Sequence, residues 1–132
     1  MHILPIKVYY EDTDAQGVVY YANYFKFFER ARTEYLREVG YEQKSLMEQG
    51  AIFVVRNVSV EFKKPAQLDQ KIEIHTQILK AGKVSFDFTQ EAFNQEGDLL
   101  CGGVVKCGCL DLKDFKPKVL PSKLYQGMKS LL

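Results

Sequence analysis

The chain of 132 residues is long enough for one domain, and its 18 Lys and Arg residues nearly balance its 17 Asp and Glu residues, for a net charge of +1. This balance excludes the overall positive field that draws proteins to nucleic acid or to anionic membranes, so any recognition of anions has to be local. Hydrophobic residues make up 46% of the chain, which is typical of a globular protein and not of a disordered one.

The first third of the chain predicts a strand, a loop and a long helix. Residues 3–10 have the pattern of a short strand that includes Pro5, and residues 11–20 form a polar loop. Between residues 21 and 39, apolar and aromatic side chains, beginning with Tyr21, recur at spacings of three and four. This spacing predicts an amphipathic helix, and Gly40 is a suitable residue to end it.

The remainder predicts an antiparallel sheet. A helical turn at residues 43–49 precedes four strand patterns, at residues 52–62, 71–79, 83–93 and 99–112. The short links between the last three strands contain glycine and suit antiparallel hairpins. One long helix followed by an antiparallel meander is typical of an α+β fold, with a curved sheet that wraps a central helix.

Other local patterns refine this expectation. In the third strand Val84, Phe86 and Phe88 alternate with polar residues, which predicts one apolar face. A short helix with Ser122 as its N-cap is expected near the end of the chain. Because no N-terminal signal pattern and no apolar run of about 18 residues is present, we expect a cytoplasmic protein without a membrane span.

Asp14 is the leading functional candidate, because it lies between the predicted strand and the start of the long helix. Unpaired N–H groups at a helix start favour developing negative charge, so a nearby carboxylate could attack, or activate water to attack, a carbonyl that they polarise. The alternative is a carboxylate that caps the helix or braces the loop. Glu11 and Asp12 are expected to shape the loop through hydrogen bonds to backbone N–H groups.

The same region closely resembles the hotdog-fold acyl-CoA thioesterases, within them the YbgC type associated with the Tol-Pal system, in the 4-hydroxybenzoyl-CoA thioesterase family. The residues that carry the resemblance are Tyr10-Glu11-Asp12-Thr13-Asp14, Gly17-Val18-Val19-Tyr20, Ala22-Asn23-Tyr24 and the helix from Phe27 to Leu36, with Phe53-Val54-Val55-Arg56, Val60-Glu61-Phe62, Pro65-Ala66-Gln67-Leu68-Asp69 and Leu120-Pro121 further on.

The resemblance implies that residues 1–132 form a single hotdog thioesterase domain, with Asp14 as nucleophile or general base. It also implies an acyl-CoA substrate whose CoA arrives with the acyl group, and neither a separate cofactor nor a metal. An open sheet edge predicts a homo-oligomer, either a dimer or a dimer of dimers, that is, a homotetramer.

Two further positions belong to the expected site. Gly17 could allow a tight turn with positive φ, so that the residues after it approach a thioester. Tyr21 stands where the YbgC-type pattern usually has His, but a backbone N–H is present with either residue. The main chain of Tyr21 is therefore the expected oxyanion donor, and a role that needs an imidazole is excluded.

The phosphates of CoA need cations, and the candidates are Lys63, Lys80 and Lys83 at strand ends or turns, with Arg56 on the strand that precedes Lys63. Lys80 and Lys83 are preferred because they flank a hairpin glycine whose N–H could add to an anion site. Each of these residues could equally be a solvated surface charge.

Histidine and cysteine offer no competing site. His75 falls on the polar face of its strand, and Cys101, Cys107 and Cys109 support neither a disulfide framework nor a four-ligand zinc site, so buried thiols are expected. The remaining alternatives are a non-catalytic module that binds acyl-CoA or acyl carrier protein and, less favoured because the helix start has no histidine, a dehydratase.

Overall fold

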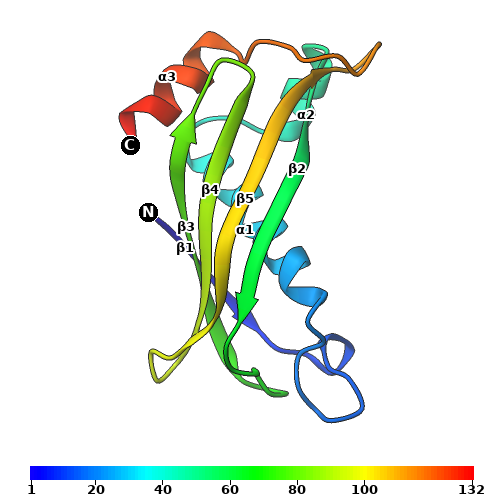
Figure 1. Cartoon of the computed structure of the whole chain (residues 1–132), viewed down its shortest axis with the longest axis vertical. Coiled ribbons are helices and arrows are strands. Elements are labelled where there is room, and N and C mark those ends of the chain that lie inside the picture. Colours follow the sequence, from blue (N-terminus) through cyan, green and yellow to red (C-terminus); the bar gives the residue numbers. More distant parts are fainter.

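The fold is a five-stranded antiparallel sheet with three α-helices, seen in a computed structural model that describes residues 1–132 and all their side chains except that of Gln43 (Figure 1). The elements in chain order are β1 (His2–Lys7), the 3₁₀ helix η1 (Tyr10–Asp12), α1 (Asn23–Glu38), α2 (Gln43–Glu48), β2 (Ala51–Phe62), β3 (Lys71–Ala81), β4 (Ser85–Asn94), β5 (Leu99–Asp111) and α3 (Ser122–Ser130). The strand order β1-β3-β4-β5-β2 leaves β1 and β2 as the two edges.

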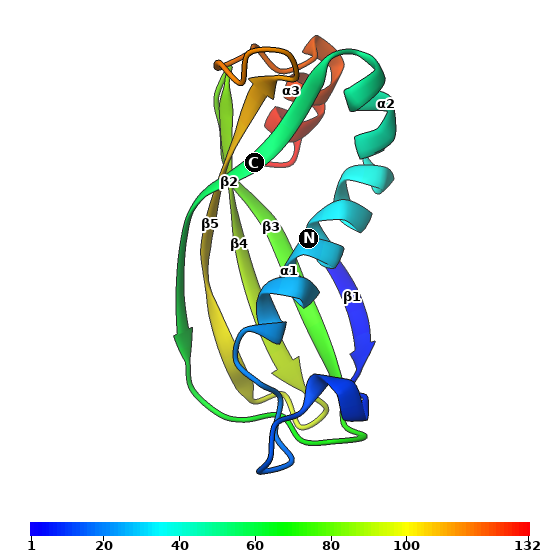
Figure 2. The same cartoon turned by 90° about the vertical axis from the view of Figure 1, so that its right-hand side faces the viewer.

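The long helix α1 lies against one face of the curved sheet, as expected (Figure 2). It begins two residues later than the sequence predicts, and Tyr21 is exposed instead of lying on the buried face. The helix ends as predicted, because Gly40 adopts a φ of 93°. Gly40 N–H donates to the carbonyl of Arg37 at 3.0 Å and Tyr41 N–H to that of Leu36 at 2.8 Å, which closes the last turn.

The first strand is shorter than predicted and ends at Lys7. The Tyr9 N–H donates to the carboxylate of Asp12 at 2.9 Å, which turns the chain into η1 instead of extending the strand. Pro5 is tolerated inside β1 because β1 is an edge strand, where a missing N–H costs no bond within the sheet.

The antiparallel hairpins β3–β4 and β4–β5 are confirmed. Phe86 and Phe88 are buried on the helix-facing side, whereas Val84 precedes β4 and is exposed. In β5, next to the edge strand β2, Gly103 meets β2 so closely that a Cβ there would collide with the carbonyl of Ser59. The three cysteines are buried and free, as predicted.

The end of the sheet away from η1 is covered by α2 and α3 (Figure 1). Leu46 of α2 and Leu124 and Met128 of α3 complete the core there. The prediction of Ser122 as N-cap was wrong by one residue, because the helix already includes Ser122 and its cap is Pro121. No helix in the described part of the chain is long and apolar enough to cross a bilayer.

The core consists of two apolar clusters stacked along α1. Phe28 and Ala31 belong to the cluster near the start of the helix, and Tyr35 and Leu36 to the cluster near its end. Between them, two fully buried polar residues, Thr76 on β3 and Gln90 on β4, face the helix. A polar layer therefore divides the two clusters.

Candidate functional site

The candidate site lies at the end of the molecule where the loop after η1 runs into α1 (Figure 1). The loop doubles back on itself, with Thr13 paired to Val19 and the Asp14 N–H donating to the carbonyl of Val18 at 2.9 Å. It is also tied to the segment between β2 and β3, because Val19 N–H donates to the carbonyl of Ala66 at 2.8 Å. These bonds hold the loop in one position relative to the sheet.

Asp14 is partly buried in this loop. One carboxylate oxygen accepts the N–H of Gln16 at 2.9 Å, and the other has no hydrogen-bond partner among the described residues. Gly17 closes the turn with a φ of 77° and donates its N–H to the Asp14 carbonyl at 3.0 Å, so the expected positive φ is confirmed. Asp14 thus braces its loop with one oxygen and keeps the other available.

The two acidic neighbours of Asp14 behave differently. Asp12 shapes the loop as expected, through its bond to the Tyr9 N–H. Glu11, for which the same role was expected, is exposed and makes no such bond in the described part of the structure. Asp12 also connects the loop to the helix, because its carbonyl accepts the N–H of Tyr20 at 3.0 Å and the side-chain amide of Asn23 at 2.8 Å.

The start of α1 offers unpaired donors. Asn23 N–H bonds to the carbonyl of Tyr20 at 2.8 Å, and Tyr24 N–H to that of Tyr21 at 3.2 Å. The N–H groups of Tyr21 and Ala22 have no acceptor among the described residues. Since the positive end of the helix dipole lies here, these two amides form a local site for negative charge.

An aromatic pocket of about 280 Å³ adjoins the helix start. The ring of Tyr21 lies 4.9 Å from that of Tyr20 and 5.9 Å from that of Phe62, measured between ring centroids. A hydrogen bond to Tyr21 raises the pKa of the Tyr20 phenol. Lys63 stands at the rim and pairs with Glu61 at 2.9 Å. The pocket has the apolar walls that a pantetheine arm would require.

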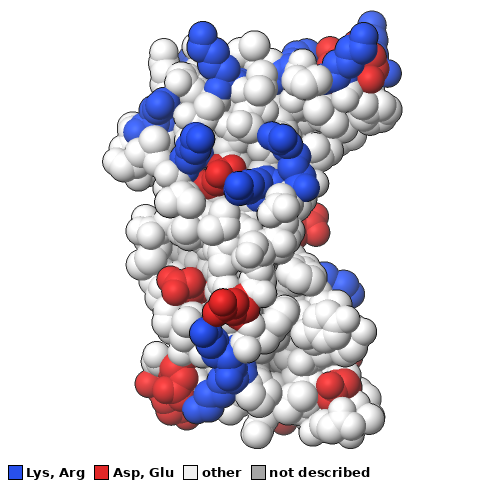
Figure 3. Space-filling model, viewed as in Figure 1, with Lys and Arg blue, Asp and Glu red and all other residues white. Residues whose placement is uncertain are grey.

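Two of the predicted phosphate-binding cations come together on the face of the sheet opposite α1. Arg56 and Lys80 line a hollow of about 480 Å³ with Lys106, around Asp87. Figure 3 shows Lys and Arg side chains gathered over the upper half of this face around acidic atoms. Sequence reasoning missed Lys106, although its position across from Asp87 follows from the pairing of β4 with β5.

The other two predicted cations lie apart from this hollow. Lys83 is in the nearby β3–β4 hairpin, where its carbonyl accepts the N–H of Leu120. Lys63 follows β2 at the opposite end of the molecule, beside the aromatic pocket. One copy of the chain therefore places the hollow, which lies beside the middle of β2, apart from the Asp14 loop, which lies beyond the end of that strand.

The described residues contain no cluster of three or more His, Cys, Asp and Glu side chains that could hold a metal ion. His75 contacts Glu73 at 3.2 Å and lies 4.6 Å from the ring of Phe93, on the face of the sheet away from α1. It thus lies on the opposite side of the sheet from the helix.

Comparison with known proteins places these features in context. Residues 16–101 match the family described as the thioesterase superfamily. The chain is 46% identical over 125 residues to an acyl-CoA thioester hydrolase, YbgC, of Escherichia coli O6:H1, covering 95% of this chain and 93% of the relative. It is 39% identical over 121 residues to the acyl-CoA thioesterase YbgC of Haemophilus influenzae, covering 91% and 88% of the two chains.

Solved structures agree with the fold. The crystal structure of a DHNA-CoA thioesterase from Staphylococcus aureus superimposes with a TM-score of 0.91 at 29% identity, over 98% of this chain and 91% of the other. The family match begins two residues after Asp14, so it includes Gly17 and Tyr21 but does not reach the carboxylate itself.

Proposed function

The chain belongs to the thioesterase superfamily and is an acyl-CoA thioester hydrolase, and we propose that Asp14 and the amide of Tyr21 carry out its chemistry. The observation that supports this most directly is the pair of unpaired N–H groups at the start of α1, tied through Asp12 to the loop of Asp14. A carboxylate and oxyanion donors are the two parts that hydrolysis of a thioester needs when no serine triad is present.

In the proposed reaction, the thioester carbonyl oxygen accepts the N–H of Tyr21, with the N–H of Ala22 as a second donor. The free oxygen of Asp14 attacks the carbonyl carbon, or takes a proton from a water molecule that attacks it. The negative charge that develops on the carbonyl oxygen is stabilised by the helix start. The C–S bond then breaks, CoA leaves as the thiol, and water supplies the oxygen of the free acid.

The rest of the substrate needs two further sites. The aromatic pocket beside Tyr21 and Phe62 would receive the pantetheine arm. The hollow lined by Arg56, Lys80 and Lys106, with Lys83 beside it, would bind the phosphates of CoA by charge and hydrogen bonding. CoA enters as part of the substrate, and the mechanism uses no separate cofactor.

A homo-oligomer would explain how one substrate could contact both the cationic hollow and the Asp14 loop, which lie apart in a single copy. The edge strand β2 is 12 residues long, and its apolar residues Val55, Val58 and Phe62 are 40–47% exposed. Such an edge is a template for pairing with a second copy. In a two-fold antiparallel pairing of β2, the Asp14 loop of one copy would lie beside the opposite half of the other copy, the half that carries the cationic hollow. The active unit is then a dimer, on its own or within a homotetramer.

Three other expectations stay predictions. The 132 residues are proposed to act as one domain, and an acyl carrier protein is proposed as an alternative carrier of the acyl group. A cytoplasmic location can be checked by fractionation of the source cells.

The test of the mechanism is Asp14→Asn. The amide keeps the acceptor for Gln16 N–H, so the loop should stay in place, but it can neither attack nor take a proton. We expect kcat to fall by at least about 10²-fold with an unchanged melting temperature. Glu11→Gln, in the same loop but without a hydrogen bond, should leave kcat unchanged. Full turnover by Asp14→Asn would refute the mechanism.

A further inference from the structure

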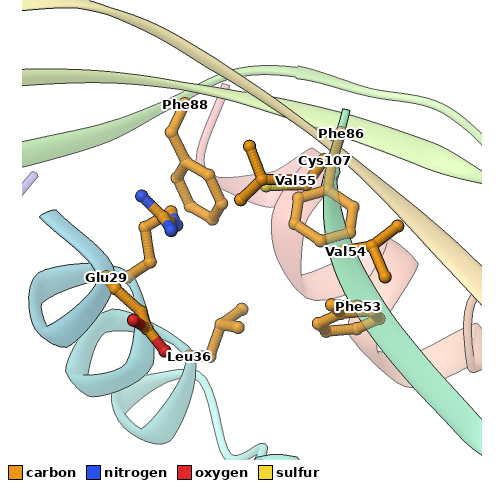
Figure 4. Close-up of a pocket in the computed structure, with 9 residues that line it drawn as sticks. Glu29, Leu36, Phe53, Val54, Val55, Phe86, Phe88 and Cys107 are labelled. Carbon is orange, nitrogen blue, oxygen red and sulfur yellow. The ribbon is translucent and has the colours of Figure 1, made fainter. Parts of the chain in front are cut away.

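A second cavity, of about 310 Å³, lies between α1 and β2 on the helix-facing side of the sheet (Figure 4). Apolar and aromatic side chains line it, including Leu36, Phe53, Val55, Phe86, Phe88 and Cys107, but most of its exposed lining surface is polar. Its volume is at the lower end of the range of small-molecule sites, about 300–1,000 Å³. An apolar chain or ring could fill it, although part of its lining is polar.

Arg32 of α1 brings a positive charge to this cavity. One guanidinium nitrogen donates to the side-chain oxygen of Gln90 at 2.9 Å, and no carboxylate of the described residues lies within ion-pair distance. The remaining guanidinium nitrogens have no hydrogen-bond partner among the described residues, and Arg32 lines the cavity. Arg32 thus presents unused donors to whatever occupies this space.

Gln90 fixes the direction of this arginine. It is fully buried, and its amide nitrogen donates to the carbonyl of Phe28 at 2.9 Å and to the hydroxyl of Thr76 at 3.0 Å. Its oxygen can then face only Arg32. Two hydrogen bonds therefore orient Gln90, and a third, from Arg32 to Gln90, orients the guanidinium at the edge of this polar layer.

The charges around the cavity compensate that guanidinium only in part. Burial lowers the pKa of Arg32, yet a guanidinium remains protonated in proteins. Burial also raises the pKa of the Cys107 thiol to about 11, so this neighbour is neutral. Glu29 lines the cavity from the same helix, and its charge acts to raise the pKa of Arg32, but it is exposed and forms no ion pair with the guanidinium. An anionic ligand would supply the missing partner.

The cavity is also placed to receive an acyl group. It shares α1 and β2 with the aromatic pocket at the helix start, since Phe53 lines one and Phe62 the other. Arg32 follows Tyr21 by eleven residues, which is about 16 Å along a helix. Val58, on the helix-facing side of β2 between the two pockets, is 40% exposed, so α1 does not cover the strand there.

We propose that this cavity binds the far end of the acyl group, and that Arg32 selects acyl chains that end in a carboxylate. The apolar walls hold the methylene chain, and the free guanidinium donors hold the terminal carboxylate. The inference rests on the proposed reaction centre at Asp14 and Tyr21. Hydrolysis itself is unchanged, because water replaces CoA at the thioester carbon and the terminal carboxylate takes no part.

The test compares length-matched thioesters on the full chain, adipoyl-CoA with hexanoyl-CoA and sebacoyl-CoA with decanoyl-CoA. We expect kcat/KM to favour the carboxylated member by about tenfold or more for at least one pair, through a lower KM, as one charge-assisted bond in a partly buried site allows. A wild-type preference for the uncharged member, or equal rates, for both pairs would overturn the proposal.

Variants assign the preference to the arginine. Arg32→Met should lose the preference, whereas Arg32→Lys, which keeps the charge, should retain part of it. Arg30→Met is the matched control, because Arg30 is exposed on the same helix over the ring of Phe27 and outside the cavity. A preference that persists in a folded Arg32→Met protein would overturn the role of Arg32.

The two proposals fail in distinguishable ways. Asp14→Asn removes hydrolysis of both members of a pair if the reaction centre is right, whereas the ratio within a pair depends on the cavity. If Asp14→Asn stays active, the reaction centre is wrong, and the wild-type ratio still decides whether the cavity selects a carboxylate. If Arg32→Met does not fold, the wild-type ratios and Arg32→Lys give the same decision.

Discussion

Tyr21 offers the proposed site two chemically distinct groups, a backbone amide and a phenol. The amide lies unpaired at the helix start, whereas the ring contacts Tyr20 and Phe62. Because the ring is engaged in these contacts, the amide is the proposed oxyanion donor, and a change of side chain at this position should cost little. A histidine or a tyrosine supplies the same main-chain N–H.

The corresponding prediction is that Tyr21→Phe keeps most of its activity, because the backbone donor is untouched. Steady-state kinetics on one acyl-CoA, together with a melting curve, measures this. If kcat instead falls by more than about 10²-fold while the melting temperature stays native, the hydroxyl and not the amide is the donor, since loss of one oxyanion donor costs about that much.

Asn23 acts as a positioning residue. Its side-chain amide donates to the carbonyl of Asp12 at 2.8 Å, and that residue stands two positions before Asp14. Asn23→Asp replaces the donor with an acceptor and should loosen the loop from the helix. We expect kcat to fall by about tenfold or more with little change in KM, because small misplacements of reacting groups are costly. A merely structural role would lower the melting temperature and leave kcat of the folded enzyme intact.

At the level of elements, β5 carries three buried thiols on its helix-facing side. Burial raises the pKa of Cys101 to about 12 and that of Cys107 to about 11. The pKa of Cys109 is raised in the same direction by the same cause. In an unfolded chain such thiols ionise near about pH 8.5. At pH values between the pKa of the unfolded thiols and the raised pKa values of the folded ones, the unfolded state binds fewer protons than the folded state.

The sign of this linkage predicts alkaline destabilisation. The contribution is fully present below about pH 8.5 and is lost as the pH rises towards 11 and 12, with a slope of up to about 1.4 kcal/mol per pH unit for each thiol. Urea unfolding at pH 8 to 10.5, at one protein concentration, measures it. Cys101→Ala should reduce the slope of unfolding free energy against pH by the contribution of one thiol. An unaltered slope would show that Cys101 does not contribute.

The polar layer formed by Thr76 and Gln90 has two roles, joining the helix to the sheet and orienting Arg32. A glutamine with no exposure is costly unless each of its polar atoms is bonded, and here the bonds connect α1, β3 and β4. They join the helix to the sheet and at the same time orient Arg32. An apolar residue at this position would pack, but it would leave Arg32 without a fixed direction.

For the whole molecule, the net charge of +1 hides an uneven distribution. Lys and Arg side chains gather on the upper half of the face that Figure 3 shows, whereas the Asp14 loop lies at the other end. A substrate that uses both ends has to extend along one copy or span two. The exposed edge of β2 favours the second arrangement.

Light scattering should therefore give a mass at least twice the 15.2 kDa of one chain. Val58→Asp places a charge on the β2 edge and should lower both the mass and the activity. Val119→Asp is the matched control, because Val119 is also exposed but lies outside the strands, and it should change neither. A fully active monomer at assay concentration would contradict an active site shared between two copies.

The sequence alone determined the features that depend on near neighbours in the chain. The period of the apolar residues located α1, and Gly40 marked its end, because helix periodicity and positive φ are properties of a few consecutive residues. The position of Asp14 before the helix could be read in the same way. The end of β1 could not, since a bond between Tyr9 and Asp12 competed with the strand pattern.

Only the tertiary structure decided which distant residues meet. Arg56, Lys80 and Lys106 converge because β2, β5, β4 and β3 lie side by side in that order, and no local pattern encodes strand order. In the same way, the burial of Arg32 and its bond to Gln90, 58 residues further along the chain, depend on how α1 packs on the sheet. Packing determines such contacts because burial and hydrogen-bond partners are set by neighbours in space, and these are brought together by long-range pairing of strands.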